Sequence, residues 1–246
     1  MEITLFATCL IEHLFPDVGK ATVRLLESLG HNVDYHSEEP CCGQFAYNSG
    51  YRSMARKMAR QFVECFSSDA VVVTPSGSCA SMIRHKYPLL FQNDPLMLKA
   101  SQELGSRLLE LSEFLVTFDQ VSKLDVEVQG RIYYHESCHM HNELGVRNQP
   151  HQILSSIETF DLCPPVPKPP CCGFGGTFSL KFPEISAAIM NLKLDAIIHQ
   201  NPTIVTAGDM GCLMHIWGGL RRRGNEIPVL HLAELLTGNI DESSLR

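Results

Sequence analysis

Short apolar segments alternate along the chain with longer amphipathic segments, and this alternation predicts strands separated by helices. Strands are expected at residues 3–6, 33–35, 70–73, 131–134, 157–160, 203–206 and 228–230. Helices are expected at 17–29, 51–66, 101–118, 150–155 and 184–199, from about 213 onward, and briefly after the last strand. Strands that alternate with helices form parallel βαβ units with right-handed crossovers, so the pattern predicts an α/β fold with parallel sheets.

Ten cysteines are the unusual feature of the composition, and eight of them fall into two matching sets. The sets are Cys9, Cys41, Cys42 and Cys79, followed by Cys138, Cys171, Cys172 and Cys212, with matching members about 130 residues apart. Each adjacent pair of cysteines is followed by glycine. Repetition at one offset indicates a duplicated unit, so we place two homologous βαβ-type halves at residues 1–120 and 121–246. We expect each half to form its core from its own strands and helices.

The repeated cysteines come directly after predicted strands, either at the strand end or in the loop that follows. Ligands of open parallel sheets bind at the C-terminal edge of the strands, because loops and helix N-termini converge there. We therefore expect the eight thiols to gather at these edges, facing a shared or adjacent cleft. Cys65 and Cys163 have no counterpart, and both are expected to be structural. Residues 164–170 are rich in proline and predict a stiff connector.

The composition and charge disfavour several classes of protein. The chain has 246 residues, 44% of them hydrophobic, and a formal net charge of -7, which disfavours a nucleic-acid surface or an anionic-membrane anchor. No apolar run is long enough for a transmembrane segment, and the N-terminus does not resemble a signal peptide. We expect a cytoplasmic protein, where clustered thiols serve metal or redox chemistry more often than structural disulfides.

Soft thiolates select zinc, copper(I) or iron–sulfur clusters. The chain has no C-x-x-C pair of the kind typical of zinc sites, and its layout permits an iron–sulfur cluster assembled from three separate loops. Zinc in the second half is the alternative. Its ligands would come from histidines near the second set of thiols together with Cys171 and Cys172, the histidines being His135, His139, His141 and His215.

The two cysteine patterns resemble the duplicated cysteine-rich (CCG) domain. That domain occurs in heterodisulfide reductases, in glycolate oxidase iron–sulfur subunits and in stand-alone lactate utilization proteins of the A type, which are the most similar in length and local sequence. The resemblance implies an iron–sulfur cluster, of the 4Fe-4S type, held by the eight repeated cysteines. In heterodisulfide reductase five cysteines hold a noncubane cluster, whereas here Ser76 and Asp209 stand where each repeat would have its additional cysteine. Each half therefore offers four thiols, with these two residues as candidate oxygen ligands or hydrogen-bonding groups.

The resemblance further implies an electron-transfer subunit of a complex that oxidises L-lactate to pyruvate. Its partners would be a ferredoxin-type iron–sulfur subunit and a third lactate utilization subunit, and no catalytic residue is assigned to this chain. Two alternatives stay open. One is a thiol/disulfide redox enzyme that uses the vicinal pairs Cys41-Cys42 or Cys171-Cys172, and the other is a scaffold subunit with zinc in its second half.

Overall fold

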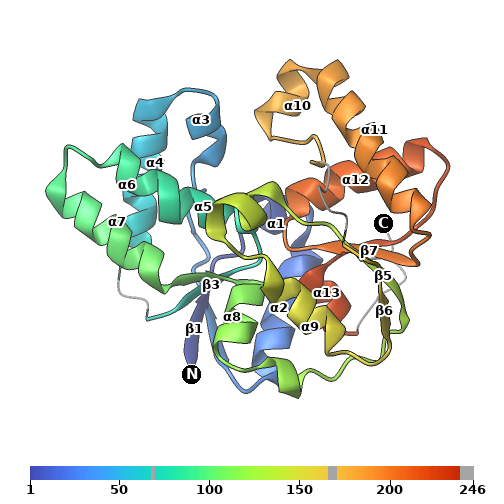
Figure 1. Cartoon of the computed structure of the whole chain (residues 1–246). Coiled ribbons are helices and arrows are strands. Elements are labelled where there is room, and N and C mark those ends of the chain that lie inside the picture. Colours follow the sequence, from blue (N-terminus) through green and yellow to red (C-terminus); the bar gives the residue numbers. More distant parts are fainter. Residues whose placement is uncertain (68–69, 166–170, 239–246) are drawn as a thin grey trace.

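The computed structural model describes residues 1–67, 70–165 and 171–238 and contains two parallel four-stranded sheets (Figure 1). The first sheet has the order β2-β1-β3-β4 and the second β6-β5-β7-β8. The strands are β1 (Glu2–Leu5), β2 (Asn32–Tyr35), β3 (Val72–Thr74), β4 (Leu108–Glu110), β5 (Gly130–Tyr134), β6 (Phe160–Leu162), β7 (Ile204–Ala207) and β8 (Val229–His231). The strand order is the same in both sheets, as expected of a duplication, and the predicted α/β class is confirmed.

Helices connect the strands in both halves. In the first half these are α1 (Cys9–Leu14), α2 (Pro16–Ser28), α3 (Gln44–Asn48), α4 (Arg52–Cys65), α5 (Gly77–Ser81), η1 (Met82–Lys86), α6 (Tyr87–Leu90), α7 (Pro95–Arg107), α8 (Leu111–Thr117) and η2 (Val121–Lys123). The second half has η3 (His139–Leu144), α9 (Asn148–Ser155), α10 (Thr177–Lys181), α11 (Pro183–His199), α12 (Met210–Arg222) and α13 (Leu232–Leu236). The pair α3 and α4 and the pair α10 and α11 occupy the same place in the two halves, on opposite sides of Figure 1.

Strand register shows how closely the halves match. In the first sheet Thr4 of β1 pairs with Val72 of β3, and in the second Tyr133 of β5 pairs with Val205 of β7. All residues of β3 and β7 are buried, as expected for inner strands that are covered on both faces. The C-terminal ends of the inner strands therefore open onto equivalent loops that carry four of the repeated cysteines, and the two adjacent cysteine pairs follow the edge strands β2 and β6.

The structure corrects two predicted elements. Residues 101–118, predicted as one helix, form α7, strand β4 and α8, and Leu108 of β4 pairs with Val72 of β3. Leucine is a strong helix former, so a strand of three residues flanked by helices carries no local signal of its own. The strand predicted at 157–160 lies instead at Phe160–Leu162, because the chain first makes a turn in which Phe160 N donates to Ile157 O.

The expectation that each half forms its own core is wrong for two of the core clusters, which join the halves. One cluster joins Ile3, Leu25 and Leu26 of the first half to Ile132 and Leu232 of the second, and α2 packs against α13. Another cluster joins residues of β1 and α1 to residues of β7 and α12. Apolar periodicity shows that a helix has a buried face but not which half covers that face, so the sequence could not show that the two halves pack as one unit.

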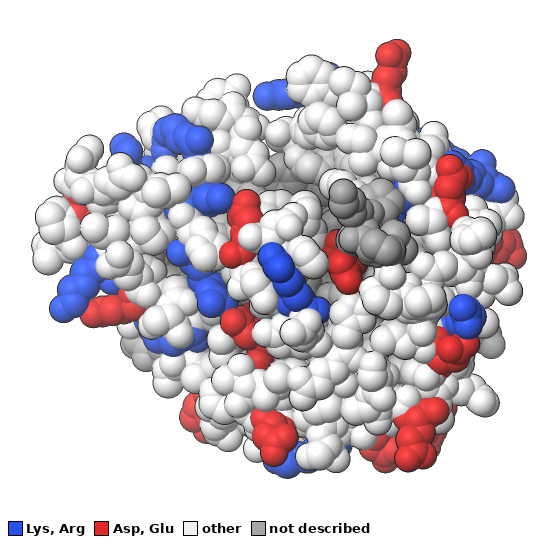
Figure 2. All heavy atoms as spheres, in the orientation of Figure 1, with Lys and Arg blue, Asp and Glu red and all other residues white. Residues whose placement is uncertain are grey.

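No helix in the described part of the chain is both long and apolar enough to cross a bilayer. Lys and Arg side chains lie beside Asp and Glu over the face shown in Figure 2. The prolines at 166–170, within the predicted connector, lie outside the described residues.

Candidate metal centre

The first set of thiols converges from three loops at the edge of the first sheet. Cys9 begins α1 after β1, Cys41 and Cys42 precede α3, and Cys79 lies in α5 after β3. The sulfur of Cys41 is 3.7 Å from that of Cys9, and the sulfur of Cys42 is 3.3 Å from that of Cys79. The structure thus brings together four thiols that are separated by up to 70 positions in the chain.

The second set repeats this arrangement. Cys138 precedes η3, Cys171 and Cys172 precede α10, and Cys212 lies in the first turn of α12. The sulfurs of Cys172 and Cys212 are 3.1 Å apart, which matches the Cys42–Cys79 pair of the first half. Cys172 and Cys212 are buried, whereas Cys138 and Cys171 are exposed.

Both sets line a single cavity between the halves. Its walls include Cys9, Cys42 and Cys79 on one side and four thiols of the second half on the other, namely Cys138, Cys171, Cys172 and Cys212. Two hydrogen bonds join the halves beside this cavity: Gly77 N donates to Gly208 O at 3.2 Å, and Ser78 N donates to Asp209 Oδ2 at 2.8 Å. The predicted shared cleft is therefore present.

One thiol of each half is favoured as a thiolate. Hydrogen bonds from Cys42 and Cys9, together with the N–H of Gly43, lower the pKa of Cys41 to about 3. In the second half Cys138, Cys172 and the N–H of Gly173 similarly lower the pKa of Cys171 to about 2.

The pKa values of the neighbouring thiols are raised. Hydrogen bonding to Cys41 raises the pKa of Cys9 and Cys42, and hydrogen bonding to Cys171 does the same for Cys138 and Cys172; burial adds to each shift. Several thiols packed together cannot all ionise unless a cation compensates them. The donor set therefore suits a metal or cluster, which would supply that positive charge.

The glycine after each cysteine pair is required by the backbone. Gly173 has φ +86°, and a Cβ there would lie 2.5 Å from the carbonyl oxygen of Ser186 on α11. Gly43 has φ +79° and approaches α4 less closely, because a Cβ there would lie 3.6 Å from the carbonyl oxygen of Ala55. The N–H groups of the two glycines donate to the sulfurs of Cys41 and Cys171, so the positive φ that glycine permits places a hydrogen-bond donor beside each sulfur.

Ser76 and Asp209 act as helix caps. The Ser76 hydroxyl accepts a hydrogen bond from Cys79 N at 3.4 Å, and Asp209 Oδ1 accepts one from Gly211 N at 3.2 Å. Asp209 Oδ2 accepts the hydrogen bond from Ser78 N across the halves. These oxygens are therefore committed to backbone N–H groups at the start of the helices that carry Cys79 and Cys212.

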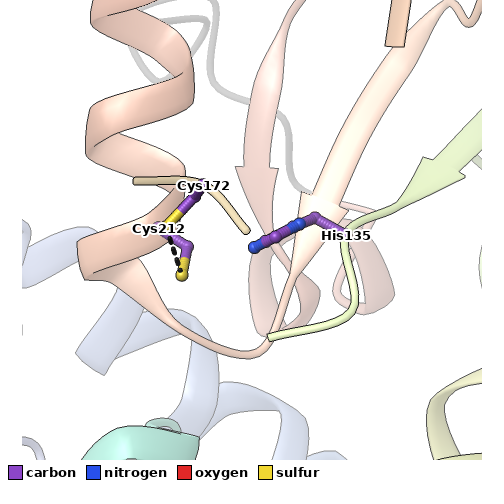
Figure 3. Close-up of side chains that lie close together, drawn as sticks. All are labelled: His135, Cys172 and Cys212. Atoms are coloured by element: carbon purple, nitrogen blue, oxygen red, sulfur yellow. Dashed lines mark hydrogen bonds between the residues drawn. The ribbon is translucent and has the colours of Figure 1, made fainter. Parts of the chain in front are cut away.

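Of the four histidines considered for zinc, the structure brings His135 to the buried thiols. One of its ring nitrogens and the sulfurs of Cys172 and Cys212 lie within 4.8 Å of one another, and the ring points toward both sulfurs (Figure 3). The other three make different polar contacts: His139 with Gln44 and, through Nδ1 at 3.8 Å, with the sulfur of Cys138, His141 with Glu136, and His215 with Ser186. The sequence predicts Cys171 and Cys172 as the thiols of a zinc site with histidine, whereas the thiols beside His135 in the structure are Cys172 and Cys212.

Two further residues near the thiols were not singled out from the sequence. The Glu39 carboxylate accepts hydrogen bonds from Ala7 N at 3.2 Å and Thr8 N at 2.8 Å, and its burial raises the pKa to about 8. Lys193 on α11 is fully buried, and burial lowers its pKa to about 8. A signal for Lys193 was available, because it lies on the buried face that the spacing of Met190, Leu194 and Ile197 defines.

Cys65 and Cys163 lie outside the thiol cavity. Cys65 ends α4 and packs against a core cluster of the first half. Cys163 follows β6, is 4% exposed and belongs to a core cluster. Both positions agree with the structural roles predicted for these residues.

Comparison with known proteins agrees with the geometry. The family model described as a cysteine-rich domain, CCG, matches residues 3–84 and again residues 132–217. The chain therefore belongs to the CCG cysteine-rich domain family and carries the domain twice, as the motifs predicted.

Curated relatives extend the similarity over almost the whole chain. Lactate utilization protein A of Oceanobacillus iheyensis is 42% identical over 236 residues, which cover 96% of this chain and 96% of that protein. The protein of the same name from Geobacillus sp. strain WCH70 is 42% identical over 96% of this chain and 99% of its own length. That of Exiguobacterium sp. is 40% identical over 98% of this chain and 99% of its own length.

Proposed function

We propose that this chain is the iron–sulfur electron-transfer subunit of a cytoplasmic system that oxidises L-lactate to pyruvate. The observation that carries the proposal is the convergence of two four-thiol sets, seven of whose thiols line one cavity, in a chain whose relatives are named lactate utilization protein A.

In this proposal Cys9, Cys41, Cys42 and Cys79 hold one centre, and Cys138, Cys171, Cys172 and Cys212 hold the second. An iron–sulfur cluster of the 4Fe-4S type, when bound, takes up and releases single electrons. The protein lowers the pKa of Cys41 and Cys171, which favours their thiolates, and provides backbone N–H donors at Gly43 and Gly173. Such donors stabilise negative charge on sulfur.

The surroundings of the thiols favour electron transfer over chemistry on a large substrate. Cys42, Cys79, Cys172 and Cys212 are each at most 8% exposed. Burial excludes water and limits structural change when the charge of a centre changes. Oxidation of lactate removes two electrons, so we assign that step to partner subunits, namely a ferredoxin-type iron–sulfur subunit and a third lactate utilization subunit.

The test is strictly anaerobic purification followed by analysis of iron, acid-labile sulfide and zinc per chain. We expect iron and sulfide in equal amounts, partial loss of both in Cys42→Ser, and unchanged amounts in the control Cys65→Ser. Zinc or no metal in the wild-type protein would contradict the proposal. Lactate oxidation by the purified chain alone with a dye acceptor would contradict its role as a carrier.

A second candidate function is thiol/disulfide exchange, and a specific observation favours it. Each half combines a thiol of low pKa with a close sulfur pair, Cys42 with Cys79 and Cys172 with Cys212. A thiolate of this kind is the attacking species in disulfide exchange. Metal-free protein that reduces a small disulfide, and loses that activity in Cys41→Ser, would establish this candidate instead.

A further inference from the structure

The two halves differ at two buried positions behind the thiols. Phe6 and His135 follow the inner strands β1 and β5, each three residues before a repeated cysteine. Phe6 N donates to Val73 O at 2.9 Å, and His135 N donates to Thr206 O at 2.7 Å, so the two residues occupy the same place in the two sheets.

Phe62 and Lys193 are the second such pair. The carbonyl of Ala55 on α4 faces Gly43, and that of Ser186 on α11 faces Gly173. Phe62 follows Ala55 by the same number of residues as Lys193 follows Ser186. The two side chains are therefore equivalent in the duplicated fold, and both are fully buried.

In the first half the two positions form an ordinary apolar contact. The rings of Phe6 and Phe62 lie edge to face, 4.7 Å apart between centroids, and each is at most 1% exposed. This arrangement fills the space behind Cys42 and Cys79 without polar atoms.

In the second half the same space holds two polar side chains that are short of partners. His135 is 1% exposed, and neither ring nitrogen has a hydrogen-bond partner among the described residues. Lys193 Nζ donates to the Tyr133 hydroxyl at 3.4 Å and forms no ion pair within the described part of the chain. Glu136 is the carboxylate that acts electrostatically on Lys193, and its oxygens lie 3.4 Å from His141 Nδ1 and 3.0 Å from His151 Nε2.

A buried imidazole without hydrogen bonds and a buried ammonium without a counter-ion are each costly to fold, so their presence points to a missing partner. The sulfurs of Cys172 and Cys212 are the chemical groups next to His135. A centre bound there would take the free ring nitrogen as a ligand, and thiolates that bind it would supply the negative charge that Lys193 lacks.

We propose that His135 is a nitrogen ligand of the second-half iron–sulfur centre, with Lys193 as its buried counter-charge, so that the second centre is reduced before the first. This inference rests on the proposed function. The second half then offers five donors, four thiols and one imidazole, whereas the first offers four thiols and no buried cation. A cation placed near the second centre stabilises its reduced, more negative state and so raises its reduction potential, whereas the neutral imidazole adds no charge to the centre.

Pulsed electron paramagnetic resonance tests the ligand directly. We expect ¹⁴N hyperfine coupling of a bound imidazole in the reduced wild-type protein and in Cys42→Ser, which retains the second-half centre. The coupling should be absent in His135→Phe, which copies the residue of the first half, and retained in the control His215→Phe. A wild-type cluster signal without this coupling would overturn the inference whether or not His135→Phe folds.

The counter-charge is tested by redox titration. Lys193→Met keeps the length of the side chain, so we expect unchanged iron content and a lower midpoint potential for the second-half signal. Lys99→Met, at an exposed position on α7, should leave the potential unchanged. An unchanged potential in Lys193→Met would overturn the counter-charge, and reduction of the first centre before the second in the wild type would overturn the order. A wild-type protein without iron would overturn both this inference and the proposed function, whereas iron without nitrogen coupling would overturn this inference alone.

Discussion

Gly173 connects the fold to the metal centre, and replacing it by alanine should damage both. At φ +86° an alanine carries backbone strain of about 1–2 kcal/mol. The new Cβ would also lie 2.5 Å from Ser186 O and 3.1 Å from Met190 N, both backbone atoms of α11 that cannot rotate away. Crowding of this kind costs about 1–3 kcal/mol, so we expect a total loss of about 3 kcal/mol in the free energy of unfolding.

Matched glycines separate the two contributions. Gly30, after α2, has φ +85° but no heavy atom within 4 Å of an added Cβ, so Gly30→Ala should cost the backbone strain alone, about 1–2 kcal/mol. Gly218, within α12, has neither positive φ nor a close neighbour, so Gly218→Ala should stabilise the protein by about 0.5–1 kcal/mol.

Urea unfolding under anaerobic conditions measures the three free energies, and iron analysis measures the effect on the centre. Gly173 N donates to Cys171 Sγ at 3.3 Å, so displacement of this loop should also reduce iron in the second half. Equal destabilisation by Gly173→Ala and Gly30→Ala would refute the steric argument. Full iron content in a destabilised Gly173→Ala would refute the link between this loop and the centre.

Two further predictions concern buried acidic groups. Burial raises the pKa of Glu110 to about 7, so the folded state holds a proton that the unfolded state has lost, and stability should fall as pH rises from about 4.5 to 7, by up to about 3 kcal/mol. Glu110→Gln should weaken the pH dependence of the free energy of unfolding, measured by urea titration at several pH values. An unchanged pH dependence in this variant would contradict the role of Glu110. Asp209→Ala should cost about 2 kcal/mol, because it removes a helix cap and the acceptor for Ser78 N. The control Asp195→Ala, which removes an exposed carboxylate paired with Arg223, should cost less than about 1 kcal/mol. Equal losses of stability in Asp209→Ala and Asp195→Ala would contradict this reasoning.

Much of the candidate site could be predicted because its information is carried by residue type and spacing. The offset of about 130 residues between Cys9 and Cys138, and between Cys42 and Cys172, identified the duplication without any structure. The strand-to-loop positions of these residues then placed them on one edge, since parallel strands present their C-terminal ends together. The structure confirms that thiols of both sets line one cavity.

The remaining features depend on contacts that no local pattern encodes. Leu108 looks helical by propensity, and only pairing with Val72 makes it part of a strand. Leu25 and Leu232 would be buried whether the halves had separate cores or a shared one, and only the folded chain shows that they share a core. His135 lay among several histidines near Cys138, and its place beside Cys212 follows from the pairing of β5 with β7.

Electron transfer from lactate is the central claim, and rapid-freeze electron paramagnetic resonance tests it most directly. The purified iron-loaded chain would be mixed anaerobically with L-lactate, alone or together with its partner subunits. We predict that lactate changes the cluster signal only when the partners are present, and that Cys42→Ser slows electron flow while Cys65→Ser does not. Reduction of the chain by lactate without partners, or unimpaired electron flow through Cys42→Ser, would contradict the account.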